Sequence, residues 1–243
     1  MSDIATRILQ SLAAVEAERQ RRASTPGLAQ AVAALKTYQQ GRFARTHASL
    51  LAHPRYGRAA NFFLNELYGP QDFTRRDAQF GRIVPALVRL FPADTVATVE
   101  ALAAVHALSE RLDTAMAIHL DGATPGRASY VRAWQGTGEA AARARQIELV
   151  MRVGEALDRH TRSFVLRASL KAMRGPARAA GMGSLQAFLE DGFEAFGAMR
   201  GAQAFLATIE ARETALAKRL FDPGAVAAVT TTLAPDDVLA SLA

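Results

Sequence analysis

Residues that favour the α-helix dominate the chain, and the alternation that marks a β-strand is rare. Alanine, leucine and arginine recur throughout the 243 residues, while β-branched residues seldom alternate with polar ones. Glycine–proline pairs separate the helix-favouring stretches, as at residues 26–27, 69–70, 175–176 and 223–224. The sequence therefore predicts an all-α fold, a multi-helix bundle of about eight to ten helices in a single domain.

These breaks also set the expected boundaries of the helices and of the domain. We expect helices over about residues 3–22, 28–51, 54–68, 72–91, 95–120, 129–135, 138–173, 184–199 and 202–221. Together they predict a helical bundle domain over residues 1–221. Residues 222–243 contain three aspartates but neither lysine nor arginine, which indicates an acidic, loosely held C-terminal tail.

The composition excludes several classes of protein. Cysteine is absent, so the chain has neither disulfides nor cysteine-bound metal sites. The N-terminal residues MSDIATRILQ place an acid early and lack the long apolar run of a secretory signal. No stretch approaches the roughly 18 uncharged apolar residues of a membrane span. We therefore expect a cytoplasmic protein with no membrane partner.

The net charge of +6 is distributed unevenly along the chain. There is no acid from residue 19 to residue 65, and a second acid-free run contains the bases of residues 159–178. Such runs form either a solvated basic face or an attraction site for an anionic partner. Tyr38, Phe43 and Tyr56 lie among the bases of the first run, as in some single-strand binders, but helical phase scatters those bases around the helix.

Two expected helices direct ionisable residues toward their apolar sides. In the helix that Asp72 is expected to cap, Arg76 and Asp77 lie at the margins of an apolar stripe, whereas Arg75 lies on the opposite side. The stripe comprises Phe73, Phe80, Ile83, Val84, Leu87 and Phe91. In the helix over residues 95–120, His106 and Asp113 project into the apolar arc, with Glu110 between them.

Inward charges need partners, because an unpaired buried charge costs several kcal/mol. The simplest arrangement pairs Arg76 with Asp113 or Glu66 and hydrogen-bonds His106 to a carboxylate. The sequence thus predicts one cluster, either a structural polar network or a ligand pocket, formed by Glu66, Asp72, Arg76, Asp77, His106, Glu110 and Asp113. Bundle metal sites often use Glu-x-x-His spacing, which is absent, so we assign no metal ligand and no particular cofactor.

The signatures of common catalytic sites are missing. The chain has no phosphate-binding loop, no nucleophile elbow, no HExxH zinc motif and no cysteine nucleophile, and we assign no catalytic residue. This pattern favours a non-enzymatic interaction or regulatory protein, with a protein partner or a second copy of itself. The alternatives are a nucleic-acid or anion binder that uses residues 19–65, and a ligand- or metal-binding bundle that uses the inward histidine–carboxylate cluster.

The run FFLNELYGPQDFTRRD at residues 62–77 is the most distinctive stretch of the chain. Together with IVPALVRLFP, HALSERLD and the later FLATIEARETALAKRLF, it resembles a family of uncharacterised bacterial helical proteins. The matching stretches cover most of residues 35–221. This resemblance implies a cytoplasmic, all-helical protein, and it implies no activity, substrate, cofactor or catalytic residue.

Overall fold

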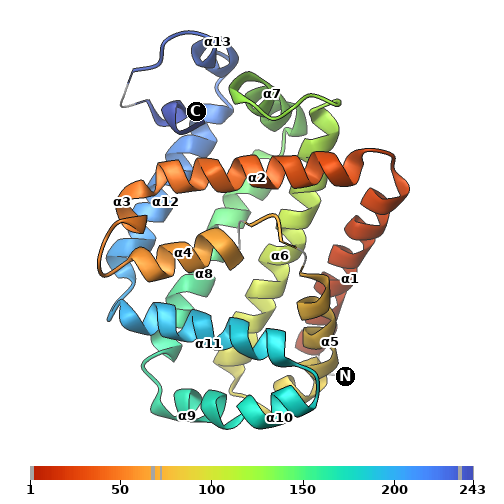
Figure 1. Cartoon of the computed structure of the whole chain (residues 1–243), viewed down its shortest axis with the longest axis vertical. Helices are drawn as coiled ribbons and strands as arrows, with labels where there is room; N and C mark the ends of the chain where they lie inside the picture. The colour runs from red at the N-terminus through yellow and green to blue at the C-terminus, as the bar shows by residue number, and fades with distance from the viewer. Residues whose placement is uncertain (1–2, 67–68, 72, 235–236, 243) are drawn as a thin grey trace.

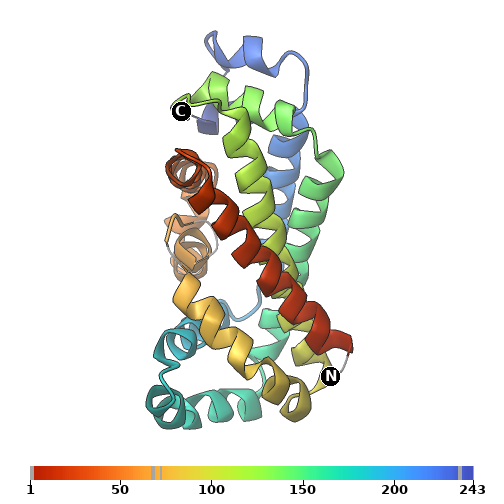
Figure 2. The same ribbon diagram turned by 90° about the vertical axis from the view of Figure 1, so that its right-hand side faces the viewer.

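Three long helices run side by side along the longest axis of the molecule (Figure 1). In this computed structural model, α6 (Ala93–His119) contacts α8 (Ala140–His160), which in turn contacts α12 (Gln203–Leu220). The N-terminal helix α1 (Asp3–Ser24) lies diagonally along α6, as Figure 2 shows. The next helix, α2 (Leu28–Thr46), runs across the bundle and contacts α6. α6 therefore lies at the centre of the packing.

Shorter helices cover one side and the lower end of this framework in Figure 1. α4 (Gly57–Glu66) packs on α11 (Gly183–Ala198), and α5 (Thr74–Leu90) packs on α1 and α11. The lower end is closed by α9 (Phe164–Ala172) and α10 (Arg174–Ala179), both of which contact α11. No residue of α9 is fully buried, so this helix lies over the interior without entering the core.

The upper end of the molecule holds one large apolar cluster. Residues of α2, α6 and α12 meet there with α7 (Arg127–Thr137), α13 (Ala225–Val229) and the 3-10 helix η1 (Val238–Leu242). A second cluster joins α4, α8, α11 and α12 around Phe196 and Phe205. The remaining short helix, α3 (Ala48–Leu51), connects α2 to α4.

The structure confirms the all-α class and the single domain. It describes residues 3–66, 69–71, 73–234 and 237–242, and this part of the chain contains helices but no strand. Within the same residues, no helix is long and apolar enough to cross a membrane. The expected number of helices is too low, because short segments such as α3, α10 and α13 are separate helices.

Two expected helices are divided in the structure. The helix expected over residues 138–173 breaks after His160, where the Ser163 hydroxyl accepts a hydrogen bond from the Leu166 amide (3.3 Å) and begins α9. The helix expected over residues 28–51 ends at Thr46. By contrast, α5 continues through Pro85 without the boundary that proline often imposes. The expected cap at Asp72 lies outside the described residues.

The expectation of a loosely held tail is wrong for the described part of residues 222–243. Leu239 and Leu242 are fully buried in the upper apolar cluster. The Tyr38 hydroxyl donates a hydrogen bond to the Leu242 carbonyl (2.6 Å), and Arg45 donates one to the Ser241 carbonyl (2.8 Å). This anchoring depends on a few apolar side chains and on backbone carbonyls, so the charge pattern of the segment does not predict it.

Candidate functional site

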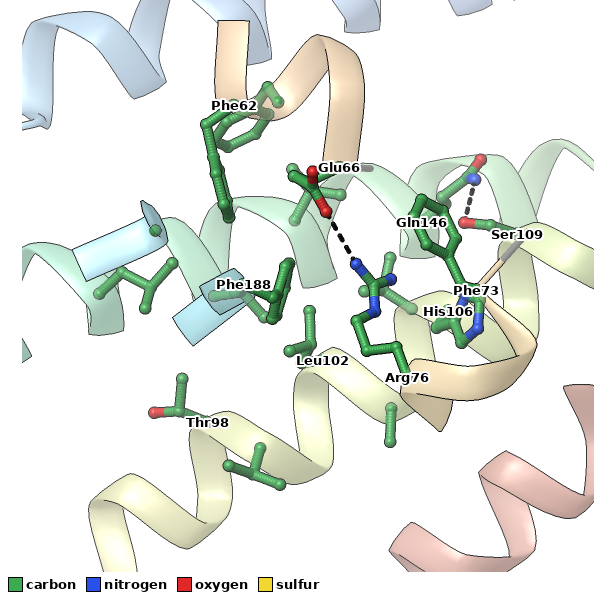
Figure 3. A pocket seen from close by; sticks show the side chains of 18 of the residues that line it. Phe62, Glu66, Phe73, Arg76, Thr98, Leu102, His106, Ser109, Gln146 and Phe188 are labelled. Carbon is green, nitrogen blue, oxygen red and sulfur yellow. Dashed lines mark hydrogen bonds and ion pairs between the residues drawn. The ribbon is translucent and has the colours of Figure 1, made fainter. Parts of the chain in front are cut away.

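A cavity of about 380 Å³ lies inside the bundle (Figure 3). Its volume falls within the range of ligand pockets, roughly 300–1,000 Å³. The walls come mainly from α5, α6, α8, α11 and α12, with further residues from α2, α4 and α9, and most of their surface is apolar. Figure 3 shows Phe62, Phe73, Leu102 and Phe188 around the space, with the polar side chains of Arg76 and Glu66 between them.

The lining of α6 changes from apolar to polar along the helix. It extends from Thr95 to Asp113, a length of about 27 Å at 1.5 Å per residue. The N-terminal part contributes Val99, Leu102, Ala103 and Val105, together with two threonines. The C-terminal part contributes His106, Ser109, Glu110 and Asp113. The side chains that line this helix therefore define an apolar end and a polar end.

The lining of α8 shows the same gradient in the opposite sequence direction. α8 begins beside the polar end with Arg143 and Gln146, and it continues with Ile147, Val150, Met151, Val153 and Leu157. The Gln146 amide donates a hydrogen bond to the Ser109 hydroxyl across the polar end (2.7 Å). At the apolar end, Thr98 and His160 hydrogen-bond each other (3.1 Å). Both helices therefore place most of their polar lining at the same end, while Thr95, Thr98 and His160 are polar groups at the other.

Arg76 lies where the apolar and polar linings meet. Its guanidinium stacks over the Phe73 ring at 3.8 Å and over the Phe188 ring at 4.3 Å, a cation–π arrangement. Arg76 Nη1 donates a hydrogen bond to Glu66 Oε2 at 3.0 Å (Figure 3). Burial lowers the pKa of Arg76, although Asp77 and Glu66 oppose this effect. Its positive charge is thus incompletely solvated.

His106 and Asp77 form a second polar contact on the cavity wall. His106 Nε2 lies 2.9 Å from Asp77 Oδ2, and Arg19 of α1 also donates a hydrogen bond to that carboxylate. Burial opposes ionisation of Asp77, but the bonds from His106 and Arg19 outweigh it and lower the pKa of this group. The expected bond between His106 and a carboxylate is thus present.

Glu110 faces the polar end with two cationic partners. Its carboxylate accepts hydrogen bonds from Arg22 Nη1 and Lys36 Nζ, each at 2.5 Å. Arg22 also binds the Glu110 carbonyl (2.5 Å) and the Thr114 hydroxyl (2.8 Å). Burial disfavours the charge of Glu110, but Lys36 and Arg22 outweigh it and lower its pKa. The structure therefore holds this group as a carboxylate.

Asp113 differs from Glu110 although both line the polar end. The expected pairing of Asp113 with Arg76 does not occur, since Arg76 binds Glu66. Asp113 accepts a hydrogen bond from the Gln39 side chain, and complete burial raises its pKa despite the nearby Lys36 and Arg143. Of the expected cluster, the structure joins Arg76 with Glu66 and His106 with Asp77, while Glu110 and Asp113 have other partners.

Sequence reasoning missed a further buried cluster around Glu213. This carboxylate accepts a hydrogen bond from Arg42 Nη1 (2.5 Å) and lies 2.8 Å from His47 Nε2. Burial opposes its charge, but Arg42 and His47 lower its pKa. His47, which belongs to the acid-free run of residues 19–65, is fully buried. Helical phase could have revealed Glu213, because it shares one face of α12 with Ile209, Leu216 and Leu220.

The bases of residues 19–65 are largely engaged within the protein. Arg45 and Arg55 bind backbone carbonyls. Ion pairs to acids outside this run are made by Arg19, Arg21, Arg22, Lys36, Arg42 and Arg58. The run therefore supplies cations to ion pairs with acids elsewhere in the chain, and the pairs of Arg22, Lys36 and Arg42 lie in the interior. This explains its lack of acids better than a continuous basic surface does.

The cluster does not assemble a metal site in the described part of the chain. No three histidine, aspartate or glutamate side chains gather there in a way that could hold an ion. The i, i+4 pair His106 and Glu110 diverges, because His106 binds Asp77 while Glu110 binds two cations. Asp72, the remaining member of the expected cluster, lies outside the described residues.

Comparison with known proteins places the chain in a family without assigning an activity. No curated protein matches the chain, and no solved structure does. A family model matches residues 18–226, which is most of the chain and includes all of the cavity wall except Leu12. This agrees with the resemblance to uncharacterised proteins. The chain belongs to the family described as Domain of unknown function (DUF8198).

Proposed function

We propose that this protein binds a small amphipathic molecule in the cavity between α5, α6, α8 and α11. The observation that carries the proposal is the shared gradient of α6 and α8, which places apolar side chains at one end and hydrogen-bonding groups at the other. Ligand sites combine a mostly apolar wall with a few convergent polar groups in this way. A structural polar network alone would not require the empty volume beside it.

The proposed role is binding without a chemical step, and it fits a regulatory or carrier protein. Each described carboxylate of the wall except Asp113 is held by a cationic or histidine partner. The bonds of Asp77, Glu110 and Glu213 fix the polar end before a ligand arrives, which lowers the entropy lost on binding. A nucleic-acid role finds less support, because the bases of residues 19–65 already bind groups of the protein.

Occupying the cavity with a large side chain tests the proposal. Leu102 lies on the cavity wall, so Leu102→Trp should weaken binding of the apolar dye Nile red by at least about tenfold, a loss of roughly 1.4 kcal/mol. Leu90→Trp is the matched control, because Leu90 is 69% exposed and is not part of the wall. Dye fluorescence should change in the first variant only. Equal binding by both variants and the unaltered protein would contradict the proposal.

A further inference from the structure

We propose that the ligand is a single-chain amphiphile with one anionic carboxylate headgroup, bound by Arg76, and that Glu66 holds this headgroup position in the empty protein. This inference rests on the proposed function and adds the chemistry of the ligand. Four observations support it: the geometry of Arg76, the position of Glu66, the balance of charge around the cavity, and the course of the apolar wall.

Arg76 presents a fixed and incompletely used set of donors at the polar–apolar junction. The Phe73 and Phe188 rings both lie against its guanidinium, with centroids 3.8 Å and 4.3 Å from Cζ. The ion pair with Glu66 joins one nitrogen, Nη1, to one oxygen, Oε2, whereas a guanidinium has five N–H donors and can bind a carboxylate through two parallel bonds. The Arg76 side chain retains 15% exposure although it lines an interior cavity. A ligand carboxylate would therefore meet an oriented cation.

Glu66 is a counter-ion that the structure holds weakly. It is the last residue of α4, where a negative charge is unfavourable beside the carbonyl end of the helix dipole. Its side chain is twice as exposed as that of Arg76, 30% against 15%, so it can turn toward water when displaced. An anionic ligand can therefore take the place of Glu66 in the ion pair with Arg76. Glu110, held by two bases in mid-helix, cannot leave in this way.

The charges around the cavity are nearly balanced among the described residues. The cationic side chains on the wall or paired with it are Arg19, Arg22, Lys36, Arg42, Arg76 and Arg143. The carboxylates on the described part of the wall are Glu66, Asp77, Glu110, Asp113 and Glu213, and burial favours the neutral form of Asp113. A bound carboxylate that displaces Glu66 keeps this balance, whereas an ammonium headgroup would place a second positive charge beside Arg76.

The apolar wall gives the course of the ligand chain. From Arg76, the lining continues past Leu102 and Val99 on α6 and past Leu157 on α8. Leu166 and Leu170 of α9 line the far end together with Met173. Leu166 and Leu170 are only partly buried, so both can gain burial when an alkyl chain packs against them.

Isothermal titration calorimetry with three probes of equal chain length tests the headgroup. Dodecanoate should bind at least about tenfold more tightly than dodecanol, because a charge-assisted hydrogen bond contributes roughly 1.5–3 kcal/mol, and dodecylamine should bind more weakly than either. Arg76→Met should abolish the preference for dodecanoate over dodecanol. The control Arg75→Met alters the exposed neighbour on the same helix and should retain the preference.

The outcomes separate this inference from the proposed function. If dodecanoate and dodecanol bind equally, or dodecylamine binds best, the anionic headgroup is refuted while cavity binding stands. If none of the three binds, the proposed function itself fails. Circular dichroism and thermal unfolding establish that each variant is folded before it is titrated.

Glu66→Gln provides a second test that does not remove the proposed anchor. Removing the competing charge should tighten dodecanoate binding by about threefold to tenfold and leave dodecanol unchanged, because only the anion competes with Glu66. An unchanged or weaker affinity for dodecanoate would refute displacement of Glu66. This variant retains Arg76, so it tests the exchange of counter-ions alone.

Discussion

Glu110 and Arg76 are both charged residues on the wall of one cavity, but their partners differ. Glu110 binds Arg22 and Lys36, and its position in the middle of α6 fixes it between them. Arg76 binds the more exposed Glu66 through one nitrogen and otherwise stacks on aromatic rings. The first arrangement maintains the fold. The second leaves a cation that can exchange its partner, which is the property that a ligand site requires.

The difference follows from the cost of burying charge. Removing one partner of a fully buried ion pair leaves an uncompensated charge, whereas a partly exposed pair is relieved by water. Substitutions around Glu110 should therefore change the stability of the protein, and substitutions around Arg76 should change its binding of ligand.

Loss of the Glu110 carboxylate should have the largest effect. Glu110→Ala leaves Arg22 and Lys36 without their shared acid, and the free energy of unfolding should fall by about 3–5 kcal/mol. Glu148→Ala is the matched control, because its pair with Arg145 is exposed and should contribute less than about 1 kcal/mol. Urea unfolding measures both. A loss below about 1 kcal/mol for Glu110→Ala would remove the distinction between the two regions.

Acid should destabilise the protein through the same carboxylates. The pKa values of Glu110 and Glu213 are lower in the folded protein than their usual 4.5, so both groups contribute stability above that pH. The unfolded chain binds more protons as the pH falls below 4.5, and the contribution is lost as the pH passes through the folded pKa values. A tenfold difference in acid dissociation constant between the folded and unfolded states corresponds to about 1.4 kcal/mol.

Glu110→Gln identifies the source of this acid sensitivity. The variant should lose less stability than the unaltered protein between neutral pH and acid, because it lacks one of the groups that must be protonated. Denaturant unfolding at a series of pH values gives both curves. Parallel curves would show that Glu110 contributes nothing to the pH dependence.

Asp113→Asn should change the free energy of unfolding only slightly at neutral pH. The contribution of Asp113 to stability depends on pH in the opposite direction to that of Glu110. Burial raises the pKa of Asp113, so its contribution to stability is present below its usual 3.8 and is lost as the pH rises through the folded value. Asparagine keeps an oxygen that can accept the hydrogen bond of Gln39 and carries no charge. The free energy of unfolding at neutral pH should change by less than about 1 kcal/mol or increase. A large loss would mean that the charged form is required.

Glu66→Gln should have the smallest effect on stability. Its pair with Arg76 is partly exposed, so the free energy of unfolding should change by less than about 1 kcal/mol. Thermal unfolding beside Glu110→Ala provides the comparison. Equal losses of stability in the two variants would show that Glu66 maintains the fold as Glu110 does. That result would remove the argument for an exchangeable counter-ion.

Helical phase in the sequence is sufficient to identify which side chains of α5 and α6 face inward. The sequence predicts that Arg76 pairs with Asp113 or Glu66 and that His106 binds a carboxylate. In the structure Arg76 pairs with Glu66, and His106 binds Asp77. Phase indicates a direction on one helix and does not select among partners on other helices. For that reason the sequence does not distinguish Glu66 from Asp113 as the partner of Arg76.

Contacts between distant segments account for the remaining differences. Glu110 meets Arg22 and Lys36 because α1 and α2 both pack on α6, a packing that no local pattern specifies. The cavity is equally invisible in the sequence, since its apolar wall has the same pattern as a filled core. The prediction for the tail is wrong because it gives the charge of this segment more weight than Leu239 and Leu242, which bury it.

The most direct measurement is a crystal structure of the protein with dodecanoate. We expect the alkyl chain to lie along Leu102 and Val99 and to end against the inner side of α9. Its carboxylate should be bonded to Arg76, with the Glu66 side chain turned toward solvent. Glu110 should keep both Arg22 and Lys36. A cavity that contains only water at saturating dodecanoate, or a carboxylate bound away from an intact Arg76–Glu66 pair, would contradict this account.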